Sequence, residues 1–404
     1  MRRSTRREFV QALSASVAFA PMVSGQQRQG SDRPGAVIAY VGTYSSTQGP
    51  NRGRGIHILE MNPSTGALVP RTVVKSEANP TWLAFNGDCT RLYSANEVSS
   101  PETGAGTVSA YAVDRPTAQL TLLNSVSSEG AGPAHISIHP AGKHALVANY
   151  GGGSVAVLPI GADGRLGSAS DVKRHQGVVG PAQPSSAPPG SFAISGHDRP
   201  HAHMIEADPS GRFVLAADLA LDQLLVWRFD VATGTLTPND PPAVSLPPGD
   251  GPRHFAFHPK GQWLYSLQEE ASTVVTFDYD PSNGRLRAKQ TLSTLPRGFA
   301  GTNFTSELAV SPDARFVYVA NRLHDSIAWF SIGADGPLTW VGEEWTRGDY
   351  PRSFTIDPSG RFLFSCNQRS DAIASFRIDR KSGALTFTGQ YTPVGSPAHL
   401  VFLR

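Results

Sequence analysis

The sequence contains only two cysteines, Cys89 and Cys366, among its 404 residues. Two cysteines cannot build a disulfide-rich scaffold, and these two are too far apart to form the CxxC pair of a zinc or redox site. We therefore interpret both as free thiols.

Charge is also scarce, since only 17% of the residues are charged and the formal net charge is +2. This balance gives no field that would attract nucleic acid or an anionic membrane surface. No apolar run reaches the roughly 20 residues of a membrane helix. The sequence also lacks the G-x-S-x-G nucleophile motif and the G-x-x-x-x-G-K-[ST] phosphate loop. We expect no nucleic-acid partner and no membrane span.

The first 25 residues differ in character from the rest. Residues 5–11 (TRREFVQ) precede a mildly apolar stretch at 12–23, which is the layout of a twin-arginine export signal. We predict a signal peptide at 1–25 and a disordered leader at 26–35. We also predict that the protein is exported and is periplasmic or extracellular.

Glycine and proline are abundant, with 40 and 32 copies, which favours many short strands joined by turns. A unit recurs after the leader: residues 252–261 (PRHFAFHPKG) and 351–360 (PRSFTIDPSG) are copies of one another. The units begin at Pro80, Pro133, Ala202, Pro252, Thr305 and Pro351, and an additional opening strand begins at Pro397.

Each unit alternates apolar and polar residues with period two and predicts four antiparallel strands, which is typical of a β-propeller blade. Residues 37–44, 56–61 and 68–74 supply the last three strands of a blade whose first strand is 397–403. We predict an all-β, seven-bladed β-propeller at 36–404, closed by strands from both chain ends. Two stacked sandwiches are the alternative, but they would not need matching turns in every unit.

The start of each first strand and the end of each second strand should lie on one face of the ring. The long connections at 45–55, 99–106, 174–200 and 296–304 fall on this face, where loops often carry function. The second residue of the first strand and the residue ending the second strand are charged in consecutive blades. We therefore expect these side chains to converge near the axis: His203, Arg253, Glu269, Arg322 and Arg352.

These charges have two interpretations. They could form an inter-blade salt-bridge network, or the excess of arginine could bind a carboxylate or phosphate of a substrate. Glu307 belongs to this network or points between blades, and Glu97 lies on the far part of the ring.

His201 and His203 share one strand face and could bind a metal, but no third ligand stands at the usual spacing, so we expect none. His203 fits better as an acid, base or substrate ligand. His135, His254 and His399 recur at one position of different blades and are interpreted as packing residues.

Several motifs carry a family resemblance, namely residues 41–44 (VGTY), 201–203 (HAH), 251–255 (GPRHF), 321–322 (NR) and 351–354 (PRSF). The chain resembles the bacterial seven-bladed propeller lactonases of the 6-phosphogluconolactonase type, a family with a fungal member that cyclises carboxymuconate. The resemblance implies a site with His203, Arg253, Glu269 and Arg322. Because residues 268–270 read QEE, Glu270 is an alternative carboxylate.

The expected function is hydrolysis of an aldono-1,5-lactone, phosphorylated or not, without a cofactor. Arg253 and Glu269 or His203 would be catalytic. The substrate-binding candidates are Arg322, Arg352, His201, Glu307 and Glu97. Two alternatives stay open: a muconate-type lactone cyclase, and a non-enzymatic exported propeller that binds a protein or glycan through Phe192, Phe299, Phe304 and Tyr350.

Overall fold

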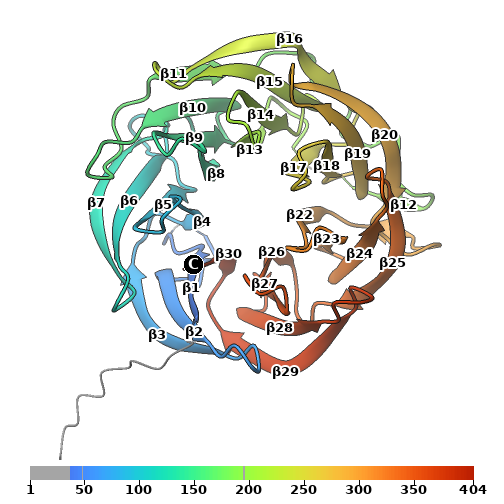
Figure 1. The fold of residues 1–404 in the computed structure, drawn as a ribbon. Coiled ribbons are helices and arrows are strands. Elements are labelled where there is room, and N and C mark those ends of the chain that lie inside the picture. Colours follow the sequence, from blue (N-terminus) through green and yellow to red (C-terminus); the bar gives the residue numbers. More distant parts are fainter. Residues whose placement is uncertain (1–36, 48, 194–195) are drawn as a thin grey trace, which may run out of the picture. The chain divides into compact units, whose positions relative to one another are not determined.

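The computed structural model describes residues 37–404 except 48 and 194–195. The predicted signal at 1–25 and leader at 26–35 lie outside these residues. The described strands form seven four-stranded antiparallel sheets arranged around one axis (Figure 1). The predicted seven-bladed propeller is therefore confirmed. No helix in the described part of the chain is long and apolar enough to cross a membrane.

Six blades are built from consecutive strands, and the first strand of each lies nearest the axis (Figure 1). Blades 1 and 2 comprise β4 (Pro80–Phe85), β5 (Arg91–Asn96), β6 (Thr107–Asp114), β7 (Gln119–Ser127), β8 (Pro133–Ile138), β9 (His144–Asn149), β10 (Ser154–Pro159) and β11 (Asp171–Arg174). Blades 3 and 4 comprise β13 (Ala202–Ala207), β14 (Phe213–Asp218), β15 (Gln223–Asp230), β16 (Thr235–Ser245), β17 (Pro252–Phe257), β18 (Trp263–Gln268), β19 (Thr273–Asp280) and β20 (Arg285–Ser293). Blades 5 and 6 comprise β22 (Thr305–Val310), β23 (Phe316–Asn321), β24 (Ser326–Ile332), β25 (Leu338–Trp345), β26 (Pro351–Ile356), β27 (Phe362–Asn367), β28 (Ala372–Ile378) and β29 (Leu385–Pro393).

The seventh blade joins the two ends of the propeller. It consists of β30 (Pro397–Phe402) followed in space by β1 (Val37–Thr43), β2 (Gly55–Met61) and β3 (Leu68–Lys75). Tyr40 lies opposite Val401 in the antiparallel pairing of β1 with β30. The predicted closure of the ring by the C-terminal strand is thus confirmed.

The hydrophobic core lies between blades because alternate side chains of a strand face the two neighbouring sheets. Each of seven buried clusters combines residues of two adjacent blades. In one of them, Phe362 and Phe364 of blade 6 pack with Leu59 and Leu400 of blade 7. No blade can bury its apolar faces alone, so the ring is the smallest stable unit.

Tyrosines on second strands add a polar link between neighbouring blades. Tyr93 donates its hydroxyl hydrogen to the carbonyl of Gly164, and Tyr265 does the same to Gly336, in turns of the following blade. Because the hydroxyls are bonded, the rings can be buried without an unsatisfied polar group.

The long connection at 174–200 is tied to other parts of the ring. Its strand β12 (Ser191–Phe192) pairs in parallel with β21 (Gly301–Thr302), which lies in the connection at 296–304. His175 of this connection bonds Asp218 of blade 3, with 2.7 Å between Nδ1 and Oδ2. The short parallel pairing thus joins the two connections, and His175 joins the first of them to blade 3.

Candidate active site

A β-bulge at the start of each first strand directs side chains toward the axis. In β17, Pro252 pairs with Gln268 and His254 with Leu267, which leaves Arg253 without a partner across the ladder. The same shift occurs in β13 around His203 and in β26 around Arg352. A bulge re-aims a side chain in this manner, which explains why the second residue of these strands faces inward.

The residues after the second strands are fixed by a polar residue that ends each strand. Asn321 and Asn367 donate amide hydrogens to the carbonyls of Thr294 and Thr346, with donor–acceptor distances of 2.8 and 2.9 Å. These bonds hold the strand end against the connection that enters the blade. The next residue in each chain segment, Arg322 or Gln368, is therefore presented to the axis.

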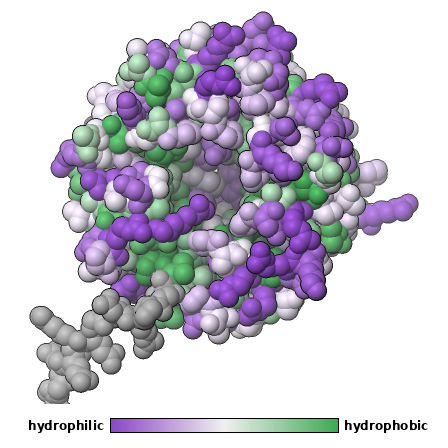
Figure 2. All heavy atoms as spheres, in the orientation of Figure 1, coloured by the Kyte–Doolittle hydropathy of each residue, from purple (hydrophilic) through white to green (hydrophobic). Residues whose placement is uncertain are grey.

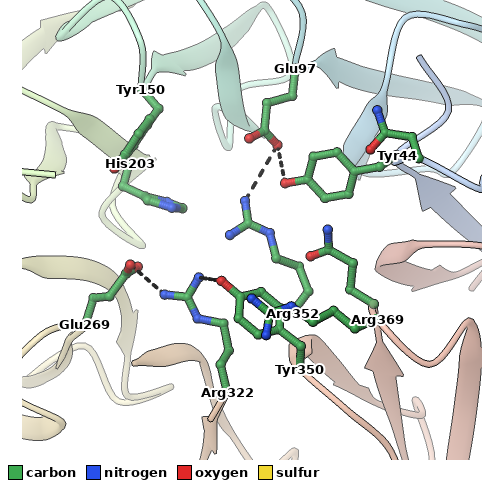
Figure 3. Close-up of a pocket in the computed structure, with 11 residues that line it drawn as sticks. Tyr44, Glu97, Tyr150, His203, Glu269, Arg322, Tyr350, Arg352 and Arg369 are labelled. Atoms are coloured by element: carbon green, nitrogen blue, oxygen red, sulfur yellow. Dashed lines mark hydrogen bonds and ion pairs between the residues drawn. The ribbon is translucent and has the colours of Figure 1, made fainter. Parts of the chain in front are cut away.

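Together these positions line an axial cavity of about 420 Å³ (Figure 3). The ring is also hollowed at its centre on the face seen in Figure 2. All seven blades or their connections contribute to the cavity, whose lining residues are Tyr44, Asn51, Glu97, Tyr150, His203, Glu269, Arg322, Tyr350, Arg352, Gln368 and Arg369.

A buried ion-pair chain connects blades 4 and 5. Glu269 Oε2 lies 2.9 Å from Arg253 Nε, and Glu269 Oε1 lies 2.6 Å from Arg322 Nη2. Burial raises the pKa of Glu269, but Arg322 and Arg253 outweigh burial and lower that pKa overall. The predicted network thus exists, and two of its members, Glu269 and Arg322, also line the cavity.

Arg253 lies behind the cavity rather than on its surface. Its side chain is only 2% exposed, and its guanidinium bonds the carbonyl of Ser306. Burial, followed by Arg352 and Arg322, lowers the pKa of Arg253 to about 9. Arg253 can therefore act on a ligand only through Glu269 and the surrounding charges.

A second polar group lies across the cavity. Glu97 Oε2 accepts hydrogen bonds from Tyr44 Oη and Thr81 Oγ1, both at 2.8 Å, and lies 3.6 Å from Arg352 Nη2 (Figure 3). Burial lowers the pKa of Arg352, but Tyr44 and Glu97 outweigh it and raise that pKa. Arg352 is consequently a permanent cation in the middle of the cavity.

The two histidines of residues 201–203 have different surroundings. His203 lines the cavity, and burial followed by Arg253 and Arg352 lowers its pKa well below the ordinary value, so the imidazole stays neutral. His201 lies behind Tyr150: its Nδ1 is 2.9 Å from the Tyr150 carbonyl and its Nε2 is 2.7 Å from Asp198 Oδ1. With both ring nitrogens bonded, His201 positions Tyr150 and has no atom left for a metal.

The remaining axial histidines form the layer beneath the cavity. Trp82 stacks on His399 with ring centroids 3.7 Å apart and contacts His135 and His254. Burial lowers the pKa of His135 and His399 to about 3, so both rings are neutral. These contacts agree with the packing role expected for them.

Glu307 and Glu270 do not line this cavity. Glu307 Oε1 lies 3.1 Å from His254 Nδ1, and the side chain borders a different pocket that also contains Trp82 and Phe354. Glu270 Oε2 lies 2.6 Å from Nδ1 of His197 in the connection at 174–200. Of the two adjacent carboxylates in the second-strand turn of blade 4, only Glu269 reaches the cavity.

Two of the predicted rim aromatics contact an arginine. The Arg322 guanidinium lies 5.5 Å from the Phe304 ring centroid and 5.3 Å from that of Tyr350. Phe299 packs edge-on against His324. All three residues are partly buried, and Tyr350 also lines the cavity.

Tyr150 and Gln368 line the cavity from the ends of second strands, the position that the sequence pattern singles out, whereas Tyr44, Asn51 and Arg369 received no site role from the sequence. Tyr44 directly follows the second strand of blade 7, so the rule that found Glu97 and Glu269 in blades 1 and 4 also applies to it. Asn51 and Arg369 lie in connections whose course no local pattern reveals.

The fold and the cavity define a β-propeller with a polar cavity on its axis. The family model described as "Lactonase, 7-bladed beta-propeller" matches residues 38–402. The chain therefore belongs to the seven-bladed β-propeller lactonase family, as its motifs predict.

Similar proteins carry names from the same enzyme class. The 6-phosphogluconolactonase of Bacillus subtilis is 35% identical over 368 residues, which cover 91% of this chain and 98% of the relative. The 6-phosphogluconolactonase of Serratia proteamaculans is 32% identical over 360 residues, covering 89% and 96%. The solved structure of the periplasmic gluconolactonase of Pseudomonas aeruginosa matches with a TM-score of 0.81 and 32% identity, covering 91% and 99%.

Proposed function

We propose that this protein hydrolyses an aldono-1,5-lactone in the axial cavity. The observation that carries the proposal is the meeting of Arg322 and Arg352 with two carboxylates, Glu97 and Glu269, in a cavity of about 420 Å³. The names of the relatives support the same reaction class.

The charges fit the requirements of the reaction. Attack of water on the lactone carbonyl places negative charge on the carbonyl oxygen, and a fixed cation beside that oxygen stabilises the transition state by about 3 kcal/mol. Arg322 and Arg352 are held by Glu269 and Glu97, respectively, so neither guanidinium has to reorganise. The ring C–O bond then breaks and yields an open-chain hydroxy acid.

The lining also favours a hydroxylated or anionic substrate. Hydroxyl, amide and guanidinium groups dominate the wall, including Tyr44, Tyr150, Gln368 and Arg369. Hydroxyl groups of a sugar bond well to such donors and acceptors, and a phosphate or carboxylate pairs with arginine. The relatives named above comprise a gluconolactonase and 6-phosphogluconolactonases, so both forms of substrate belong in the test.

The deciding experiment is a pH-stat assay of the purified protein with a panel of aldonolactones, each with and without a phosphate. We expect hydrolysis well above the buffer rate for at least one member. Arg322→Ala and Arg352→Ala should each lower kcat/KM at least tenfold. If no lactone of the panel is opened faster than in buffer, the proposal is wrong.

We also propose export through the twin-arginine signal at residues 1–25, in keeping with the periplasmic gluconolactonase among the similar structures. Replacing Arg6 and Arg7 by lysine should retain the protein in the cytoplasm on cell fractionation. Equal amounts of wild-type and variant protein in the periplasm would contradict this route.

A further inference from the structure

The geometry points to Glu97 as the proton acceptor of the reaction, with Tyr44 as the residue that positions it. This inference rests on the proposed lactone hydrolysis. It assigns to blade 1 a step that the family motifs place on Glu269 or His203.

Glu269 is poorly suited to accept a proton. Both of its oxygens are paired with guanidinium groups, at 2.9 Å from Arg253 and 2.6 Å from Arg322. Protonating Glu269 would break two buried ion pairs and leave cations without their partner. Its side chain is also only 9% exposed.

His203 is neutral but is a weak base in this position. Burial, followed by Arg253 and Arg352, opposes a positive charge on its ring. An imidazole that resists protonation can still orient a hydroxyl group of the substrate. It gives little driving force for removing a proton from water.

Glu97 has the arrangement that a general base needs. Its Oε2 accepts hydrogen bonds from Tyr44 and Thr81 and lies 3.6 Å from Arg352 Nη2, which is a longer and more exposed ion pair than either of those of Glu269. No described residue donates a hydrogen bond to Oε1. The side chain is 21% exposed and points into the cavity (Figure 3). One oxygen is thus fixed by the protein while the other is free to bind a water molecule.

The step balances without any further reactant. Glu97 Oε1 takes a proton from water while the water oxygen bonds to the lactone carbonyl carbon, and the oxyanion that forms pairs with an arginine of the cavity. When the ring C–O bond breaks, the departing alkoxide receives a proton from the Glu97 carboxyl group. The product is the hydroxy acid, and Glu97 is again a carboxylate.

The test compares three Glu→Gln variants in the full-length protein. We expect Glu97→Gln to lower kcat at least 100-fold, to change KM less than threefold, and to remove the acidic limb of the pH–rate profile. Glu269→Gln should lower kcat less and keep that limb. Glu102→Gln, an exposed residue of the neighbouring connection, is the control for the loss of one negative charge and should match wild type.

Three further variants separate an effect on the reaction from an effect on folding. Adding formate should partly restore hydrolysis to Glu97→Ala but not to Glu269→Ala, because a small carboxylate can occupy the vacated space. Tyr44→Phe should shift the acidic limb of the profile while thermal unfolding stays close to wild type.

The outcomes distinguish this inference from the proposed function. If wild type opens a lactone and Glu97→Gln retains more than a third of its kcat, the assignment to Glu97 is overturned and the lactonase proposal stands. The assignment is equally overturned if Glu269→Gln alone loses the acidic limb. If wild type opens no lactone, the proposed function fails and the role of Glu97 fails with it.

Discussion

At the scale of single residues, the arginines of the site divide into one that supports the cavity and others that face it. Arg253 is 2% exposed in its side chain and holds Glu269 from behind. Arg369 is exposed, lines the cavity, and stacks 3.9 Å from the Tyr350 ring centroid. Arginine thus has a structural role at position 253 and faces the cavity at position 369.

This division predicts different effects on stability. Arg253→Met should lower the free energy of unfolding by about 3–5 kcal/mol, because it removes one partner of a buried ion pair. Arg369→Met, the matched control, should change it by no more than about 1 kcal/mol, the value of an exposed cation–π contact. Denaturant unfolding measures both, and equal midpoints for the two variants would contradict the prediction.

At the scale of elements, the connection at 174–200 is fastened by a buried histidine. His197 Nδ1 lies 2.6 Å from Glu270 Oε2, and its Nε2 lies 3.5 Å from Asp222 Oδ1. Burial lowers the pKa of His197, but the hydrogen bonds to Asp222 and Glu270 outweigh it and raise the pKa from 6.5 to about 9. The charged imidazole therefore links the connection to blades 3 and 4.

The raised pKa of His197 makes the stabilisation from its ion pairs with Glu270 and Asp222 dependent on pH. Because the pKa is raised on folding, the stabilisation is complete below about pH 6.5 and is lost as the pH rises through about 9. We expect His197→Asn to lower the thermal unfolding midpoint clearly at about pH 6 and much less at about pH 9.5.

A second histidine provides the control for this measurement. Burial and Arg54 lower the pKa of His57, so His57→Asn should show no such loss of effect at alkaline pH. If the effect of His197→Asn is the same at both pH values, the ion pair does not fasten the connection.

At the scale of the whole molecule, stability depends on closing the ring. Strand β30 pairs with β1 and places Leu400 and Phe402 in the cluster shared by blades 6 and 7. Losing each of these buried side chains costs about 2–5 kcal/mol. The loss of β30 would also leave β1 as an exposed strand edge, which favours aggregation.

Deleting residues 397–404 should therefore abolish cooperative unfolding and give aggregated protein on size-exclusion chromatography. Deleting only residues 403–404, which follow β30, is the control and should leave a folded protein. A monomeric variant without β30 that still unfolds cooperatively near the wild-type temperature would contradict the importance of closure.

The sequence alone determined the blades and their limits. Each predicted unit start, from Pro80 to Pro397, is the first residue of an innermost strand. The starts of the units could be predicted because period-two alternation and turn residues depend only on residues close together along the chain. The same position rule identified Glu97, His203, Glu269, Arg322 and Arg352 as cavity residues.

Only the tertiary structure decided which of these residues line the cavity and which support the lining residues from behind. Arg253 lies behind Glu269, His201 behind Tyr150, and Glu307 beside a different pocket. Whether a carboxylate oxygen is paired or free depends on side chains from blades that are far apart in the sequence. Those contacts arise from packing around the axis, and no local pattern of residues encodes them.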